Sequence, residues 1–328
     1  MDKITVVVPC YNESCVLTTF YDKIKKIKDK LVSEAILELL FVDDGSSDET
    51  LSMLRRLSAS DKTVRYISFS RNFGKEAAIY AGLKEADGDF TVIMDADMQD
   101  PPKYIIEMYN MLKLNRELDC VAAKRITRAG EPPVRTFLAH MFYRLINKVS
   151  EVEITDGARD YRMMRRNVVD AVLALSEKRR FSKGIFSWVG FNTGWIEYEN
   201  ISRAAGDTKW SLWGLMKYAF EGIMAFSVFP LLLPLIPAAL FLVSGIVLFI
   251  IAAVKGLSAV SGIAAALASL IFFVSSVVLF SIGIIGGYMS KIYSEVKSRP
   301  TYLLKEKSVS FADEAEIRIH EAQYTDVR

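Results

Sequence analysis

Short apolar runs and longer mixed segments alternate along the first 125 residues. The runs are rich in valine, isoleucine and phenylalanine and are bounded by glycine, proline or acidic residues, which is typical of buried strands. In chain order they lie at residues 3–9, 38–43, 64–70, 90–94 and 119–125. Segments with helical spacing, such as residues 75–86, lie between them. This alternation predicts an α/β domain with a largely parallel sheet and helices on both faces.

Polar residues follow three of the expected strands. They are residues 9–13 after the first strand, 43–45 after the second and 95–97 after the fourth. Parallel strands that neighbour one another end at the same edge of a sheet, where open α/β sheets bind their ligands. We therefore expect the acids at these strand ends to lie in one crevice and to need a cation or a donor-rich ligand.

The stretch DADMQDPP, residues 95–102, carries the densest candidate chemistry. Aspartate oxygens with an amide nearby are hard ligands suited to Mg²⁺ or Mn²⁺ that carries a phosphorylated substrate. A capped loop that opens the next helix accounts for the same residues, because aspartate and proline are also common there. From this stretch alone, both interpretations stay open.

Two long uncharged stretches follow in the second half of the chain, at residues 229–254 and 256–290. Each exceeds the roughly 20 residues with which a helix spans a bilayer. We expect a two-helix transmembrane hairpin over residues 229–290, although two buried helices of a soluble protein would fit as an alternative. Basic residues lie mainly on the flanks, which predicts that both flanks are cytoplasmic: Lys209, Lys217, Lys291, Lys297 and Arg299, against Lys255 in the turn.

The segments that flank the hairpin complete the expected organisation. Residues 211–228 resemble an amphipathic helix, which would lie at the membrane interface or pack on the soluble domain. Residues 291–328 form a cytoplasmic tail that turns charged and is expected to be a solvated or loosely helical extension beyond residue 300. The catalytic domain would then cover residues 1–210.

Composition excludes several classes of protein. With 328 residues, 51% apolar residues and mean hydropathy +0.22, the chain is too long and too apolar for one ordinary soluble domain. A net charge of +2 gives no field that would attract nucleic acid. Three cysteines without zinc-type spacing favour free thiols in a reducing compartment. Neither a GxGxxG motif after the first strand nor a P-loop is present, which argues against dinucleotide oxidoreductases and P-loop NTPases.

Five motifs in order carry a resemblance to a known family. They are TVVVPCYNE, VDDGSSDET, SFSRNFGKEAAIYAGL, MDADMQDPP and RAAGDTKW, and two expected membrane spans follow them. Together they resemble family 2 glycosyltransferases of the polyprenyl-phosphate type, the group of dolichol-phosphate mannose synthase and the bactoprenol glucosyltransferases. The resemblance implies a GT-A-type nucleotide-sugar-binding domain on a membrane anchor.

The resemblance also implies roles for residues in the N-terminal motifs. Six match the part of the family that holds the nucleotide's base and ribose: Pro9, Tyr11, Asn12, Glu13, Asp43 and Asp44. Asp95 and Asp97 match the DxD pair, and Gln99 matches an amide of the Mg²⁺ or Mn²⁺ shell. Lys75 stands where the family places a basic group near the donor, though a solvated lysine in a first helical turn would look the same.

Two later motifs should face the acceptor. GARDYRMM, residues 157–164, resembles the family's DFRL element, with Asp160 as the carboxylate nearest the transfer site and Asp156 as the alternative. Arg162 is expected at a phosphate or in a structural contact. In RAAGDTKW, Arg203 and Lys209 would bind phosphate oxygens, and Arg125 would join them.

The implied reaction is inverting transfer of a hexose from a nucleotide sugar, with UDP-glucose as the default, to undecaprenyl phosphate. Asp160 would act as a base or as an orienting group. A processive polysaccharide synthase and a non-catalytic nucleotide-sugar scaffold are the alternatives, but the first lacks its QxxRW element here and the second would not need the acids. A homo-oligomer could form through the small residues Gly283, Gly286 and Gly287 of the second span.

Overall fold

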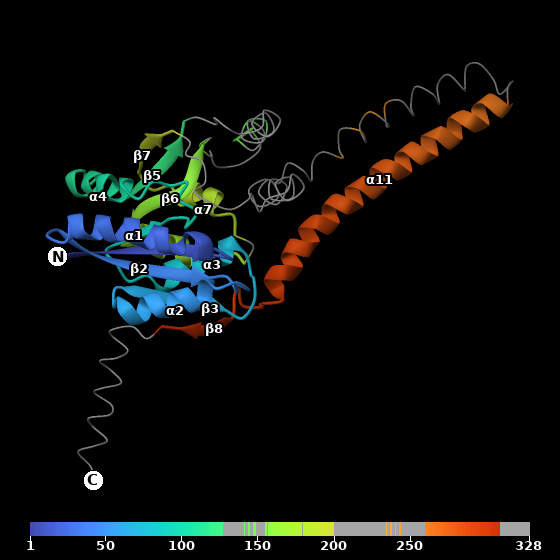
Figure 1. The fold of residues 1–328 in the computed structure, drawn as a ribbon. Coiled ribbons are helices and arrows are strands. Elements are labelled where there is room, and N and C mark those ends of the chain that lie inside the picture. The colour runs from blue at the N-terminus through green and yellow to red at the C-terminus, as the bar shows by residue number, and fades with distance from the viewer. Residues whose placement is uncertain are drawn as a thin grey trace, which may run out of the picture. The chain divides into compact units, whose positions relative to one another are not determined.

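The computed structural model describes residues 1–126, 155, 157–178, 180–199 and 260–308, with a few single positions between 141 and 243. The chain divides into two compact units. The first contains Met1–Arg144, Val152–Ser211 and Pro300–Arg328, and the second contains Leu145–Glu151 and Leu212–Arg299. The described sheet and all its covering helices belong to the first unit (Figure 1).

Eight strands in the described part of the first unit form one sheet, in the order β7-β5-β6-β4-β1-β2-β3-β8. Their bounds are β1 (Asp2–Cys10), β2 (Ala35–Asp43), β3 (Val64–Phe69), β4 (Phe90–Ile93), β5 (Cys120–Arg125), β6 (Ala158–Arg165), β7 (Thr193–Tyr198) and β8 (Leu304–Lys307). β1 lies at the centre, parallel to β2 on one side and to β4 on the other. This order brings the ends of β4, β1 and β2 to the same edge.

Helices cover both faces of the sheet. α1 (Ser14–Leu31), α2 (Thr50–Ser60) and α4 (Tyr104–Leu114) pack on one face, and α3 (Lys75–Glu85), α6 (Arg166–Ala174) and α7 (Ser182–Trp188) pack on the other. The alternation along β1 shows why: Val6 and Val8 join the core beneath α1, whereas Val7 joins the core beneath α3. Both faces of β1 are buried, so its sequence reads as a continuous apolar run.

α3 packs unusually close to the sheet because its inner face is built from small residues. Ala77, Ala78 and Ala81 are buried there, and a Cβ placed on Gly82 would lie 2.1 Å from Val7 Cγ1. The close approach brings the first turn of α3 to the carboxyl edge of the sheet, where Lys75 reaches Asp95, just after β4.

The sheet is largely parallel, as expected, but two of its described strands run in the opposite direction. β6 runs antiparallel to both of its neighbours, β4 and β5, and β8 runs antiparallel to β3. Both reversed strands are rich in charge, and neither carries an apolar run like those from which β1–β5 were predicted; β7 was not predicted either. The five predicted strands and the cover of helices on both faces are confirmed.

The segment after residue 300 also differs from expectation. We expected a solvated or loosely helical extension, but residues 304–307 form edge strand β8. Ser70 N–H donates to Leu303 O at 2.9 Å, Tyr302 stacks on Phe69 with ring centroids 4.8 Å apart, and Arg55 binds both carboxylate oxygens of Glu306. Polar residues suit an edge strand that is exposed to water.

The second unit contains α11 (Val260–Val296). Among the described residues, α11 is the one helix long and apolar enough to cross a membrane, with a mean hydropathy of 1.8 over Phe273–Ser290. The expected two-helix hairpin is not confirmed, because nearly all of residues 229–254 lie outside the described residues. Residues 211–228, the expected amphipathic helix, lie outside them as well.

Candidate active site

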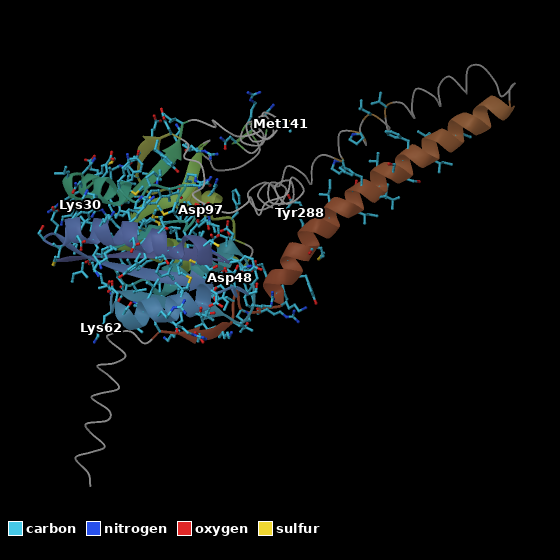
Figure 2. The ribbon with its side chains drawn as sticks, viewed as in Figure 1. Lys30, Asp48, Lys62, Asp97, Met141 and Tyr288 are labelled. Atoms are coloured by element: carbon cyan, nitrogen blue, oxygen red, sulfur yellow. The ribbon has the colours of Figure 1, made fainter. Side chains whose placement is uncertain are left out.

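The expected polar residues lie at the carboxyl edge of the central strands. β1, β2 and β4 end at Cys10, Asp43 and Ile93, and backbone hydrogen bonds continue the pairing into the loops, from Asp44 N to Cys10 O and from Met94 N to Val7 O. Figure 2 shows Asp48 and Asp97 toward this end of the sheet and Lys30 and Lys62 toward the other. The acidic loops therefore lie where open α/β sheets bind ligands.

The loop after β1 is fastened to the loop after β2. Asn12 adopts φ 53°, a left-handed conformation that asparagine tolerates, and its side-chain oxygen accepts a hydrogen bond from Ser47 N–H at 2.9 Å. Its own N–H donates to Ser46 Oγ at 2.9 Å. Glu13 N–H donates to Thr50 Oγ1 at 2.9 Å, whereas Tyr11 is 37% exposed and Pro9 is half-buried. Tyr11 is thus presented to solvent from a rigid pair of loops.

Asp43 and Asp44 are buried and hold the loops in place. Asp43 accepts hydrogen bonds from Ser68 Oγ at 2.7 Å and Ser46 N–H at 3.1 Å. Asp44 accepts bonds from the N–H groups of Phe73 and Gly74 at 2.6 and 2.9 Å. Burial raises the pKa of Asp44 to about 6, although the two N–H donors oppose that change.

Gly45 allows the loop after β2 to pass close to the loop before α3. It has φ +68°, and a Cβ there would lie 2.4 Å from the carbonyl carbon of Arg71. A side chain at this position would push the two loops apart and break the hydrogen bonds to Asp44.

Lys75 joins two carboxylates that are far apart in the sequence. Its Nζ lies 2.7 Å from Asp95 Oδ1 and 2.7 Å from Asp160 Oδ2. Asp95 follows β4, and Asp160 lies on the neighbouring antiparallel strand β6. Despite burial, Asp160 and Asp95 raise the pKa of Lys75, and Lys75 together with Lys183 lowers the pKa of Asp160. Lys75 is thus cationic and Asp160 anionic at neutral pH.

The DxD loop turns sharply between its second aspartate and the amide residue. Met98 has φ 64°, and Gln99 N–H donates to Asp97 Oδ1 at 3.1 Å. Burial and the charge of Asp95 raise the pKa of Asp97. The described residues contain no group of three or more acids, histidines or cysteines placed to hold a metal ion by themselves.

A second layer of contacts, which sequence analysis did not identify, supports the DxD loop. Buried Asp100 accepts hydrogen bonds from Tyr198 OH at 2.6 Å and Arg159 Nε at 3.2 Å. Tyr161 OH donates to Pro101 O at 3.1 Å. Because side chains alternate along β6, Arg159 and Tyr161 support this loop while Asp160 and Arg162 project to the α7 face. The alternation of side-chain direction along a strand at residues 158–162 is the feature of the sequence from which these contacts could have been predicted.

The face beneath α7 carries further residues that the sequence did not reveal. Ser182, at the start of α7, donates hydrogen bonds through N–H and Oγ to Glu76 Oε2. Burial and the nearby Asp160 raise the pKa of Glu76. Lys183 lies close enough to Asp160 to lower its pKa. Lys183 stands in none of the quoted motifs, and Glu76, next to Lys75 in SFSRNFGKEAAIYAGL, was assigned no role.

The expected phosphate-binding residues are only partly described. Arg162 is 5% exposed, donates to Arg159 O at 3.0 Å and lies 3.8 Å from the ring centroid of Phe186. Arg125 ends β5, and its N–H donates to Gly157 O at 3.0 Å. Arg203, Lys209 and Asp156 lie outside the described residues, so their expected roles stay predictions.

The amino-acid sequence is similar to one protein family and to several named proteins. Residues 5–173 match the family model described as glycosyl transferase family 2. A protein of Bacillus subtilis (strain 168) named as a glycosyltransferase, CsbB, is 39% identical over 94% of this chain and 93% of its own length. The bactoprenol glucosyl transferase of Shigella phage SfII is 38% identical, covering 92% of this chain and 97% of that protein. The chain therefore belongs to glycosyl transferase family 2.

A solved structure shows a more distant likeness. The glucosyl-3-phosphoglycerate synthase of Mycobacterium tuberculosis, in complex with Mn²⁺, UDP and phosphoglyceric acid, overlaps with a TM-score of 0.46 at 18% identity, over 68% of this chain and 76% of that one. Family membership itself defines the protein as a glycosyltransferase, and its mixed α/β sheet agrees with the GT-A-type fold expected from the motifs.

Proposed function

We propose that this protein transfers a hexose from a nucleotide sugar, UDP-glucose as the first choice, to the phosphate of a membrane polyprenol such as undecaprenyl phosphate. The observation that carries the proposal is the Asp95–Lys75–Asp160 bridge at the carboxyl edge of the sheet in a family 2 chain. The relatives named bactoprenol glucosyl transferase support the choice of sugar and lipid.

The donor would bind across the loops after β1, β2 and β4. Exposed Tyr11 offers a surface for the base, next to the fastened Asn12 and Glu13. Buried Asp43 and Asp44 shape this pocket through the loops they hold. Because both carboxylates already accept hydrogen bonds from the protein, their part in binding base and ribose is mainly one of positioning.

The DxD loop fits a divalent cation in its donor chemistry. Asp95 and Asp97, with the Gln99 amide, offer hard oxygen ligands of the kind that Mg²⁺ and Mn²⁺ prefer. The charge of Asp95 already raises the pKa of Asp97, a repulsion that a cation would relieve. The diphosphate of the substrate would have to supply the remaining ligands, and the bound cation would neutralise the departing diphosphate.

Lys75 and Asp160 would organise the transfer step. A lipid phosphate is already anionic, so it attacks without losing a proton to a base. The lowered pKa of Asp160 makes it a weak base, which favours the orienting role: Asp160 holds Lys75 between the DxD loop and the acceptor. Attack from the side opposite the departing diphosphate would invert the anomeric carbon and give a β-linked sugar phosphate from an α-linked donor.

The lipid acceptor requires a membrane location. We place the protein in the cytoplasmic membrane, with α11 and residues 229–254 as two spans and with the catalytic domain and both termini in the cytoplasm. Arg125, Arg162, Arg203 and Lys209 would bind the acceptor phosphate. No atom of the described residues lies within 4 Å of a Cβ added to Gly283 or Gly286 on α11, and a second copy of the helix could pack against these small residues.

A transfer assay tests this function. Detergent-solubilised full-length protein would receive undecaprenyl phosphate, Mg²⁺ or Mn²⁺ and a panel of radiolabelled nucleotide sugars, with the Asp97→Ala variant and an EDTA sample alongside. The proposal predicts label in the lipid phase from one donor and its loss with EDTA or in the variant. Label in a polymer instead would indicate the polysaccharide synthase, and no turnover by folded, UDP-binding protein would indicate the scaffold.

A further inference from the structure

A cavity of about 180 Å³ lies between α7 and the β5–β6–β7 part of the sheet. Arg162 and Lys183 line it, together with three hydroxyl residues and three aromatic ones: Thr155, Ser187, Thr193, Phe186, Phe191 and Trp195. Arg162 is 5% exposed and Trp195 is 38% exposed, so the cavity leads from solvent to a buried guanidinium. Asp160 lies on the same face of β6 as Arg162, two residues away.

Among the described residues, the lining of this cavity carries two cations and no carboxylate. Within the described part of the chain, no carboxylate forms a direct ion pair with Arg162; the guanidinium contacts a backbone carbonyl and the Phe186 ring, and the charge of Asp160, two residues away, acts on it at longer range. A buried cation without a direct anionic contact is stabilised further when a ligand supplies one.

Arg162 also has an unused donor. Among the described residues, its buried Nε has no hydrogen-bond partner, although buried polar groups are normally paired. Stacking on Phe186 fixes the plane of the guanidinium, which suits a planar donor set for a phosphate. The unsatisfied Nε and the cationic lining of the cavity both point to an anion.

We infer that this cavity binds the phosphate group of a lipid phosphate, with Arg162 and Lys183 as its charged ligands and the aromatic residues receiving the first part of the hydrocarbon chain. The inference rests on the proposed function for the acceptor's identity, and it adds Lys183 and the aromatic wall to the expected phosphate-binding residues. The bound phosphate would lie on the α7 face next to Asp160, the carboxylate that Lys75 holds.

Binding is measured first without any nucleotide sugar. Isothermal titration of the full-length protein in a neutral detergent would use hexyl phosphate, which is water-soluble, and inorganic phosphate. Lys183→Met removes one charge from a half-buried side chain, and Arg162→Lys keeps the charge but loses the planar fork. Lys113→Met is the matched control, since Lys113 binds Asp2 at the opposite end of the sheet.

Both cavity variants should weaken hexyl phosphate binding by about tenfold or more, as loss of a charge-assisted contact does, while UDP affinity stays within about twofold. Hexyl phosphate should bind the wild type more tightly than inorganic phosphate does, because of the aromatic wall. In the transfer assay, Lys183→Met should raise KM for the lipid and leave KM for the nucleotide sugar unchanged. The Lys113→Met control should behave as the wild type.

Unchanged hexyl phosphate affinity in both cavity variants would overturn the inference, even if the wild type transfers sugar to the lipid. Weakened phosphate binding with an unchanged KM for the lipid would assign the cavity to a free phosphate and overturn its link to the acceptor. Weakened hexyl phosphate binding in a protein that transfers nothing to lipid would support the cavity while the proposed function fails.

Discussion

At the scale of single residues, the site depends on Lys75, whose amine lies between two carboxylates from different strands. Replacing it with methionine removes the cation that bridges Asp95 and Asp160. We expect Lys75→Met to lower kcat by about 100-fold or more, a loss typical of removing a preorganised charge. Lys84→Met, on the exposed face of the same helix, is the control. A Lys75→Met enzyme with kcat within twofold of the wild type would contradict this role.

A second single residue, Asp44, makes the stability of the folded protein depend on pH. Its pKa is raised from 3.8 to about 6, so the folded protein binds a proton more tightly than the unfolded chain. The contribution of Asp44 to the free energy of unfolding is therefore greatest below pH 4. It decreases by on the order of 3 kcal/mol as the pH rises through 6. Asp44→Asn should flatten the thermal stability profile between pH 4.5 and 7. A variant profile parallel to that of the wild type would refute the assignment.

The acids of the site and Lys75 could be identified from the sequence, but the contacts between them could not. Asp95, Asp97 and Asp160 stand in motifs, and acids at strand ends can be recognised from one sequence. The ion pair between Lys75 and Asp160 spans 85 positions and depends on β6 lying next to β4, which no local pattern encodes. Lys183 and Glu76 are likewise brought close to Asp160 by tertiary packing, that of α7 against α3 and β6.

At the scale of elements, the strands that could be predicted are those that are buried on both faces and therefore need an uninterrupted apolar sequence. The central strands are buried on both faces, so their valine and isoleucine runs identified them. β6 carries charged residues on both faces because Arg159 and Asp160 each reach an ion-pair partner, so it has no continuous apolar run. β8 has the sequence LKEK and is held by backbone pairing and by Glu306, so it carries no apolar signal.

The docking of residues 302–307 on β3 predicts a stability effect. Tyr302 stacks on Phe69 and packs against the core beneath α3, so Tyr302→Ala should destabilise the catalytic domain by about 2 kcal/mol. The neighbouring Leu303, 54% exposed, provides the control in Leu303→Ala. Differential scanning fluorimetry should show a midpoint lowered by about 4–8 °C for the first variant only. Equal midpoints for both would show that this segment contributes little.

At the scale of the whole molecule, one apolar helix is described and a second span is a prediction. If residues 229–254 and α11 form a hairpin, residues 255 and 297 lie on opposite sides of the membrane. In a background with Cys10, Cys15 and Cys120 replaced by serine, Lys255→Cys and Lys297→Cys should react with an impermeant maleimide from opposite sides of sealed vesicles. Labelling of both from the same side would exclude the hairpin.

We propose above all that the edge bearing Asp95, Lys75 and Asp160 transfers sugar to a lipid phosphate. Its most direct test is a single-turnover measurement of label passing from UDP-[¹⁴C]glucose to undecaprenyl phosphate, for the wild type and Asp160→Asn, with UDP affinity determined in parallel. We expect lipid-phase label from the wild type and a rate lower by about 100-fold or more in the variant, with UDP affinity within a few fold. Equal rates in the two proteins would contradict the claim.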